Sequence, residues 1–142
     1  MPASLKPCLF CAIVAGTEPA ARVLEEEHCM AFLDARPLFE GHVLLVPRQH
    51  HVTLADLPEP LVAPLFLAAQ RLCRAVERAQ EAQGSFVAMN NVVSQSVPHL
   101  HVHVVPRRRK DGLRGFFWPR TRYAGEAAMA EVGARIRAAL EG

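Results

Sequence analysis

The sequence predicts an α+β domain with a largely antiparallel sheet. Five short apolar stretches are typical of strands, at residues 22–26, 29–33, 42–46, 86–90 and 99–105. Two longer stretches, one central and one C-terminal, repeat their apolar residues at the spacing of a helix. Strands and helices do not alternate regularly along the chain, which favours α+β over a parallel α/β arrangement.

The central helix is expected to begin near Asp56 and to end at Gly84. Asp56, Pro58 and Glu59 combine an N-cap carboxylate, an early proline and an acidic first turn. One apolar face follows, at Leu61, Leu65, Ala68, Leu72, Ala75 and Ala79. Pro64 interrupts this face and predicts a kink or a later start. A second stripe predicts the C-terminal helix, at Met129, Val132, Ile136 and Leu140.

Length and composition bound the class of protein. The 142 residues suit a single domain, with an expected core at 8–107 and an extension at 108–142. A hydrophobic content of 51% excludes intrinsic disorder, and a net charge of +2 argues against nucleic acid as a general partner. We find no apolar run near the ~20 residues of a membrane helix and no signal peptide. A cytoplasmic protein with reduced cysteines and no membrane partner is expected.

Three histidines alternate with apolar residues between His99 and Pro106. Side chains on a strand point alternately to its two faces, so His99, His101 and His103 would share one face at intervals of ~6–7 Å. Leu100 and its neighbours would point into a core. Two chemistries remain open: a catalytic zinc held by all three histidines, or one nucleophilic histidine that its neighbours orient.

Two of the four cysteines form a CxxC pair, Cys8 and Cys11. Such a pair indicates a metal site, a redox site or two buried thiols. A redox pair is expected within a βαβ unit, and the sequence has no such pattern. Cys29 and Cys73 stand in apolar settings and are predicted to be small buried hydrophobic residues.

Several motifs, taken together and in order, resemble the histidine triad (HIT) family of nucleotide hydrolases and transferases. They are Leu9–Ile13, Ala31–Asp34, Gly41–His50, Asn90–Pro98 and the histidine stretch with its closing Pro106-Arg107. The resemblance covers residues 8–107. It implies a HIT-like fold, in which a mainly antiparallel five-stranded sheet carries one long central helix and a C-terminal helix.

The resemblance also implies a reaction. His101 would attack the α-phosphorus of a nucleotide to form a covalent nucleotidyl-histidine, which water then resolves. Neutral imidazole suits this role near pH 7. His103 would donate to a phosphate oxygen or to the leaving group, and His42 would support the triad. Gln95 and Ser96 would contact the phosphate, with turn formation as their alternative role.

A nucleotide site follows from the same resemblance. Asp34 would accept hydrogen bonds from the ribose hydroxyls. Asn90 or Asn91 would take the role of a family asparagine, although Val92-Val93-Ser94 replaces the family's glycine-rich stretch. The base would enter an apolar slot formed by Leu9, Phe10, Ile13 and Phe32.

A structural zinc ion is the implied cofactor. Cys8, Cys11, His50 and His99 resemble the zinc set found in part of the family, and two Cys with two His make a closed tetrahedral site. His51 is the adjacent rival for His50. Implied substrates are adenosine phosphoramidates, nucleotidylated amines or dinucleoside polyphosphates, and a homodimer is expected. The rival functions are a non-catalytic nucleotide- or RNA-binding module and a zinc hydrolase with its ion on the triad.

Two segments after the triad carry separate hypotheses. The basic run Arg107–Lys110 could attract a polyphosphate chain or RNA, or could be a solvated loop. The aromatic run Phe116–Trp118 suggests a dimer contact or a lid over the pocket.

Overall fold

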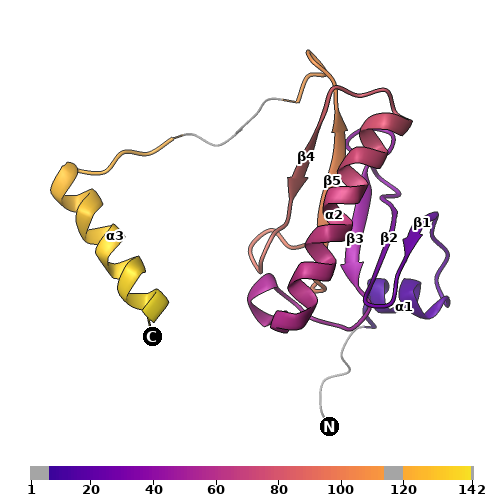
Figure 1. Ribbon diagram of the computed structural model, residues 1–142, viewed down its shortest axis with the longest axis horizontal. Helices are drawn as coiled ribbons and strands as arrows, with labels where there is room; N and C mark the ends of the chain where they lie inside the picture. Colours follow the sequence, from indigo (N-terminus) through magenta and orange to yellow (C-terminus); the bar gives the residue numbers. More distant parts are fainter. Residues whose placement is uncertain (1–6, 114–119, 142) are drawn as a thin grey trace, which may run out of the picture. The chain divides into compact units, whose positions relative to one another are not determined.

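Five strands pair into one antiparallel sheet in the order β1-β2-β3-β5-β4 (Figure 1). The computed structural model describes residues 7–113 and 120–141. The strands are β1 (Arg22–Glu25), β2 (Cys29–Leu33), β3 (Val43–Pro47), β4 (Gly84–Ala88) and β5 (Val102–Arg107). The chain divides into two units, residues 1–111 with the sheet and residues 112–142. The predicted α+β class and the five-stranded sheet are confirmed.

Helix α2 (Glu59–Ala79) lies along one face of the sheet (Figure 1). Its buried residues include Leu65, Ala68 and Leu72, which form one core cluster with Ala31 of β2 and Val102 of β5. The expected apolar stripe therefore does face the sheet. The hydrophobic effect makes such a face the main source of helix stability in a domain of this size.

The predicted ends of the central helix were wrong. The N-cap is Pro58, and the Asp56 carboxylate instead bonds Thr53 in the capping box of a short 3-10 helix, Leu54–Asp56. The helix ends at Ala79, whereas Gly84 already begins β4. Pro64 lies within the helix and does not set its start.

A helix that the sequence did not indicate, α1 (Leu9–Ala15), packs on the other face. Its N-cap is Cys8, whose Sγ accepts from Cys11 N, and its C-cap is Gly16, which has a φ of 83°. Phe10 and Ile13 of α1 form a second core cluster with Met30 and Phe32 of β2. Because Ala31 belongs to the first cluster, successive residues of β2 point to the two opposite layers.

The predicted strand at 99–105 was wrong in its start, because β5 begins only at Val102. Leu100 N donates to His51 O at 2.7 Å, outside the ladder with β3. The expected alternation of side chains holds nonetheless. Phe10 contacts the rings of both His99 and His101, while Leu100 lies in the core cluster beneath α2.

The second unit contains α3 (Glu126–Glu141), which confirms the predicted C-terminal helix. Its apolar residues Met129, Ile136 and Leu140 are exposed. Phe116–Trp118 lie outside the described residues, so the structure does not test the hypothesis about them. Among the described helices, none has the length and apolar character needed to cross a bilayer.

Candidate active site

A pocket of about 570 Å³ lies between α1, the end of β2 and the chain that leads into β5. Its volume is in the range of small-molecule sites. It is lined by eight of the predicted site residues: Leu9, Phe10, Ile13, Phe32, Asp34, Ser96, His101 and His103. Residues that are far apart in the sequence thus meet around one cavity.

The apolar end of this pocket is built on Phe10. Its ring meets Phe32 edge to face at 5.4 Å between centroids, and it meets His101 at 5.0 Å. Phe10 and Phe32 are buried, whereas Leu9 is 46% exposed. Edge-to-face contacts with Phe10 hold the imidazole of His101 in one orientation beside a flat apolar slot.

The tautomer of His101 follows from one hydrogen bond. Its Nδ1 lies 2.7 Å from the backbone oxygen of His99. A carbonyl oxygen only accepts, so Nδ1 carries the proton and donates it to that bond. The lone pair of the neutral ring is then on Nε2. Because His101 lines the pocket, the neutral ring would offer that lone pair for nucleophilic attack.

The tautomer of His103 is set through His42. Leu38 N donates to His42 Nδ1 at 3.0 Å, so neutral His42 carries its proton on Nε2. His42 Nε2 lies 3.0 Å from His103 Nδ1 and donates to it. His103 therefore carries its own proton on Nε2. The pair thus leaves His103 with an N–H donor rather than a second lone pair for the pocket that it lines.

Burial keeps both histidines neutral. It lowers the pKa of His42 below its ordinary value, against an opposing effect of Asp34. Burial, followed by repulsion from His101 and His42, lowers the pKa of His103 to about 4. Near pH 7 both rings are therefore neutral, and each carries a single proton, on its Nε2.

Asp34 lies at the junction of the pocket and the histidine pair. Its Oδ1 accepts from Arg36 N at 2.8 Å, and its Oδ2 lies 3.8 Å from His42 Nε2. Asp34, His42 and His103 offer three ligand atoms within 4.8 Å of one another, as a metal site would. However, a cation on His42 Nε2 would displace the proton that the Leu38 contact places there. The geometry therefore favours a hydrogen-bonded pair over a metal site.

The loop before β5 is held by side-chain amides. Gln95 Nε2 donates to Val52 O at 2.6 Å, and Asn91 Oδ1 accepts from Leu54 N at 2.8 Å. Asn90 Nδ2 donates to Ser94 O at 3.2 Å. These three predicted site residues shape the loop and do not line the pocket, in contrast to Ser96. Val92 and Ser94 of the loop have positive φ values of 69° and 63°.

A second cluster of potential ligands lies beside the triad: Cys8, Cys11, His50 and His99, whose ligand atoms all lie within 4.8 Å of one another. Cys8 Sγ and Cys11 Sγ lie 3.3 and 3.5 Å from His99 Nδ1, and Cys11 Sγ lies 3.3 Å from His50 Nδ1. With Zn–S of about 2.3 Å and Zn–N of about 2.0 Å, a tetrahedral site separates sulfur from nitrogen by about 3.5 Å. The four residues fit such an ion.

His99 is oriented as a metal ligand. Its Nε2 lies 2.8 Å from Pro47 O and donates to it, which leaves the lone pair of Nδ1 directed at the two thiols. Burial, followed by Cys8, raises the pKa of Cys11 to about 11, and a bound cation would reverse that shift. His51 is outside the cluster; its Nε2 is buried with no hydrogen-bond partner among the described residues.

Two parts of the site were not predicted. One is the backbone N–H of Leu38, which sets the tautomer of His42. The other is the pocket wall at Pro19, Ala20 and Ala21. A backbone donor leaves no signature in residue type. The only local hint was Gly41 directly before His42, which is typical of a tight turn.

Comparison with known proteins identifies the family. Residues 15–110 match the HIT domain. The chain is 40% identical over 109 residues to an uncharacterised HIT-like protein of Mycobacterium tuberculosis, with 75% of this chain and 76% of that protein covered. It is 34% identical over 109 residues to an adenosine 5'-monophosphoramidase of Saccharomyces cerevisiae, with 75% of this chain and 66% of that protein covered.

Solved structures agree with the sequence comparisons. A member of the HIT family from Bacillus subtilis superposes with a TM-score of 0.84 at 31% identity, covering 93% of this chain and 96% of that one. A zinc-bound histidine triad family protein from Mycobacterium smegmatis superposes with a TM-score of 0.72 at 38% identity, covering 90% and 96%. With its fold, its three histidines and the domain match in agreement, the chain belongs to the HIT domain family.

Proposed function

We propose that this protein hydrolyses a nucleotide at its α-phosphate through a covalent nucleotidyl-histidine on His101. One observation carries the proposal: His101 and His103 line the same pocket, and the Nδ1 of each ring is taken by a protein partner, which leaves the Nε2 lone pair of His101 and the Nε2–H of His103 for a substrate. A nucleophile beside a donor is the arrangement that phosphoryl chemistry requires, because charge develops on the phosphate oxygens as the new bond forms.

The reaction proceeds in two steps. The lone pair of His101 Nε2 attacks phosphorus while the bond to the leaving group breaks. Water then attacks phosphorus, the Nε2–P bond breaks, and neutral His101 is restored. The leaving group takes a proton from the solvent as it departs in the first step, and the attacking water returns a proton to the solvent in the second. Over both steps one water therefore supplies the hydroxyl that phosphorus keeps and replaces the proton that the leaving group takes. His103 Nε2–H donates to a phosphate oxygen throughout, and Ser96 adds a hydroxyl to the lining of the same pocket.

The proposed substrate is an adenosine phosphoramidate, with a dinucleoside polyphosphate as the alternative. The adenosine 5'-monophosphoramidase relative supports the first choice. The base would occupy the slot beside Phe10 and Phe32, and the ribose hydroxyls would reach the carboxylate of Asp34. Such an arrangement would put the α-phosphate at His101, because Asp34 and His101 line the same pocket.

We also propose a structural zinc ion on Cys8, Cys11, His50 and His99. The ligand spacing, the orientation of His99 and the zinc-bound relative support it. All four positions of a tetrahedral ion are taken by protein, so the ion would join α1 to the chain before β5 rather than activate water. The free ring nitrogen of His99 faces the two thiols, and His103 Nδ1 accepts from His42, which speaks against an ion held by all three triad histidines.

A homodimer is the proposed assembly, through the edge strand β4. This strand is last in the sheet and carries no proline or charged residue that would block pairing, and Val87 on it is 42% exposed. Pairing with β4 of a second copy would continue the sheet. Light scattering should give a dimer for the wild type and a monomer for Val87→Lys.

Substitution of His101 tests the catalytic proposal. We expect His101→Asn to lower turnover of adenosine phosphoramidate by roughly 10³-fold or more while nucleotide binding persists. Mass spectrometry of quenched wild-type reactions should show a nucleotidyl adduct that the variant lacks. His28→Asn, at an exposed histidine, is the control and should keep full activity. Binding without turnover in the wild type would instead indicate a non-catalytic nucleotide-binding module.

A further inference from the structure

We infer that Gln80, at the end of α2, is a positioning residue that acts through His42 on His103. The inference rests on the proposed function, because it assigns a role in holding the donor of that reaction. Gln80 is not among the residues of the nucleotide pocket, and it reaches the histidine pair only through the turn that carries His42.

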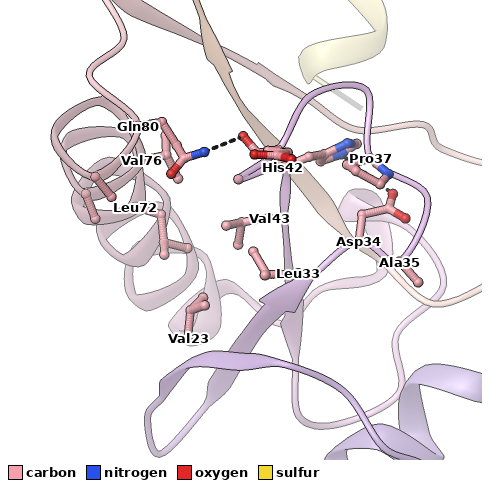
Figure 2. A pocket seen from close by; sticks show the side chains of 14 residues that line it. Val23, Leu33, Asp34, Ala35, Pro37, His42, Val43, Leu72, Val76 and Gln80 are labelled. Atoms are coloured by element: carbon pink, nitrogen blue, oxygen red, sulfur yellow. Dashed lines mark hydrogen bonds and ion pairs between the residues drawn. The ribbon is translucent and has the colours of Figure 1, made fainter.

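Gln80 contacts this turn in two ways. Its Nε2 donates to Glu40 O at 3.0 Å, and Figure 2 shows the side chain reaching from α2 toward the loop of His42. It also lies so close to Gly41 that a Cβ on residue 41 would be 2.7 Å from Gln80 Cγ. Gln80 thus donates a hydrogen bond to Glu40 and lies close against the neighbouring Gly41.

The central peptide of the turn can face either of two ways, and the hydrogen bond from Gln80 favours one of them. His42 N donates to Phe39 O at 3.0 Å, which closes a four-residue turn, and Gly41 at its third position has a φ of 93°. These are the features of a type II turn. A type I turn would reverse the central peptide, and with it the Glu40 oxygen. The bond from Gln80 therefore stabilises the type II form.

A cavity lies beside the turn, which is also held by a hydrogen bond from Asp34 N to His42 O, at 2.9 Å. The cavity has a volume of about 650 Å³ and lies beside the C-terminal part of α2 and the start of β3 (Figure 2). Leu72 and Val76 line it from α2, and Val43 lines it from the sheet. Gln80 lines the same cavity together with Glu40 and Gly41, the two residues that it contacts.

His42 is the last residue of the turn, so the turn sets the position of its ring. The two nitrogens of that ring are both hydrogen-bonded: Nδ1 accepts from Leu38 N and Nε2 donates to His103 Nδ1, each at 3.0 Å. When the Glu40 peptide reverses, the ring moves relative to both partners, and the preference of His103 for a proton on Nε2 weakens. Loss of the Gln80 donor is expected to lower kcat by roughly 3- to 10-fold, the effect of one hydrogen bond, with KM nearly unchanged.

The experiment compares three variants. Gln80→Met removes the donor at similar size, and Gln80→Lys restores a donor. Gln83→Met is the matched control, because Gln83 accepts from Arg109 N away from the turn. Imidazole ¹⁵N spectra report the tautomers directly. We expect Gln80→Met to shift the signals of His42 and His103, to leave those of His101 unchanged and to lower kcat, and we expect Gln80→Lys to recover both readouts.

Two results would overturn the inference: unchanged His42 and His103 spectra in Gln80→Met, or equal losses in the lysine and methionine variants. Should Gln80→Met fail to fold, Gly41→Ala perturbs the same contact from the other side and must produce the same spectral change. The spectra need no substrate, so an inactive wild type would reject the proposed function while the tautomers still decide the role of Gln80.

Discussion

The Nδ1 of His101 is hydrogen-bonded to the backbone oxygen of His99, at 2.7 Å. The same His99 directs its ring nitrogens to Pro47 O and to the thiols of Cys8 and Cys11. One residue therefore belongs to both sites: its ring belongs to the cysteine–histidine cluster, and its carbonyl sets the tautomer of the proposed nucleophile. Movement of His99 should therefore disturb the hydrogen bond that orients the ring of His101.

Metal removal is predicted to lower stability and turnover together. At zinc concentrations about 100-fold above Kd, binding would stabilise the fold by about 2.7 kcal/mol, and its loss should lower Tm on the order of 10 °C. Turnover should fall roughly 10-fold, because His99 loses its anchor. Metal analysis and thermal unfolding of Cys11→Ser test this. Cys73→Ser should retain metal, and equal zinc content in both variants would contradict the site.

Asp34→Asn is predicted to raise KM for a ribonucleotide substrate about 10-fold with little change in kcat, because one charged hydrogen-bond acceptor is lost. Steady-state kinetics with a 2′-deoxy substrate provides the control. Wild type should lose affinity for the deoxy substrate, and Asp34→Asn should lose no more. Additive losses would mean that the carboxylate does not contact the ribose.

The free energy of unfolding is predicted to decrease as the pH falls from about 6.5 to about 4. The pKa of His103 is lowered by burial from 6.5 to about 4, so in this window the unfolded chain binds a proton that the folded protein does not. The contribution is fully present above pH 6.5. Urea unfolding at several pH values should give a shallower slope for His103→Asn. Parallel curves for wild type and variant would show that His103 is not shifted.

Val92→Gly is predicted to stabilise the protein by about 0.5–1 kcal/mol, because a β-branched residue pays a steric penalty at positive φ that glycine avoids. Val92 has a φ of 69° and is exposed, so little packing is lost. Val93→Gly is the matched control: it is also exposed, and glycine there should only destabilise. Denaturant unfolding distinguishes the two, and equal destabilisation of both variants would reject the prediction.

Much of the fold was predictable where periodicity reports burial. The stripe of Leu65, Ala68 and Leu72 indicated a helix packed on a sheet, and the packing confirmed it. The boundaries of the helices were less predictable, because a residue such as Asp56 can cap more than one turn. In the structure its carboxylate bonds Thr53 and caps the short 3-10 helix instead of α2. Helix α1 was missed because seven residues carry too short a repeat, and its stability depends on packing Phe10 against the sheet.

By itself, the sequence determined the family, the alternation of the three histidines and the residues that can hold a metal, because each depends on residue type and spacing. The tertiary structure alone decided which nitrogen of each ring bears the proton. That choice depends on backbone partners, His99 O for His101 and Leu38 N for His42. Every residue carries a backbone carbonyl and every residue except proline carries a backbone N–H, so only folding decides which of these groups meets a ring.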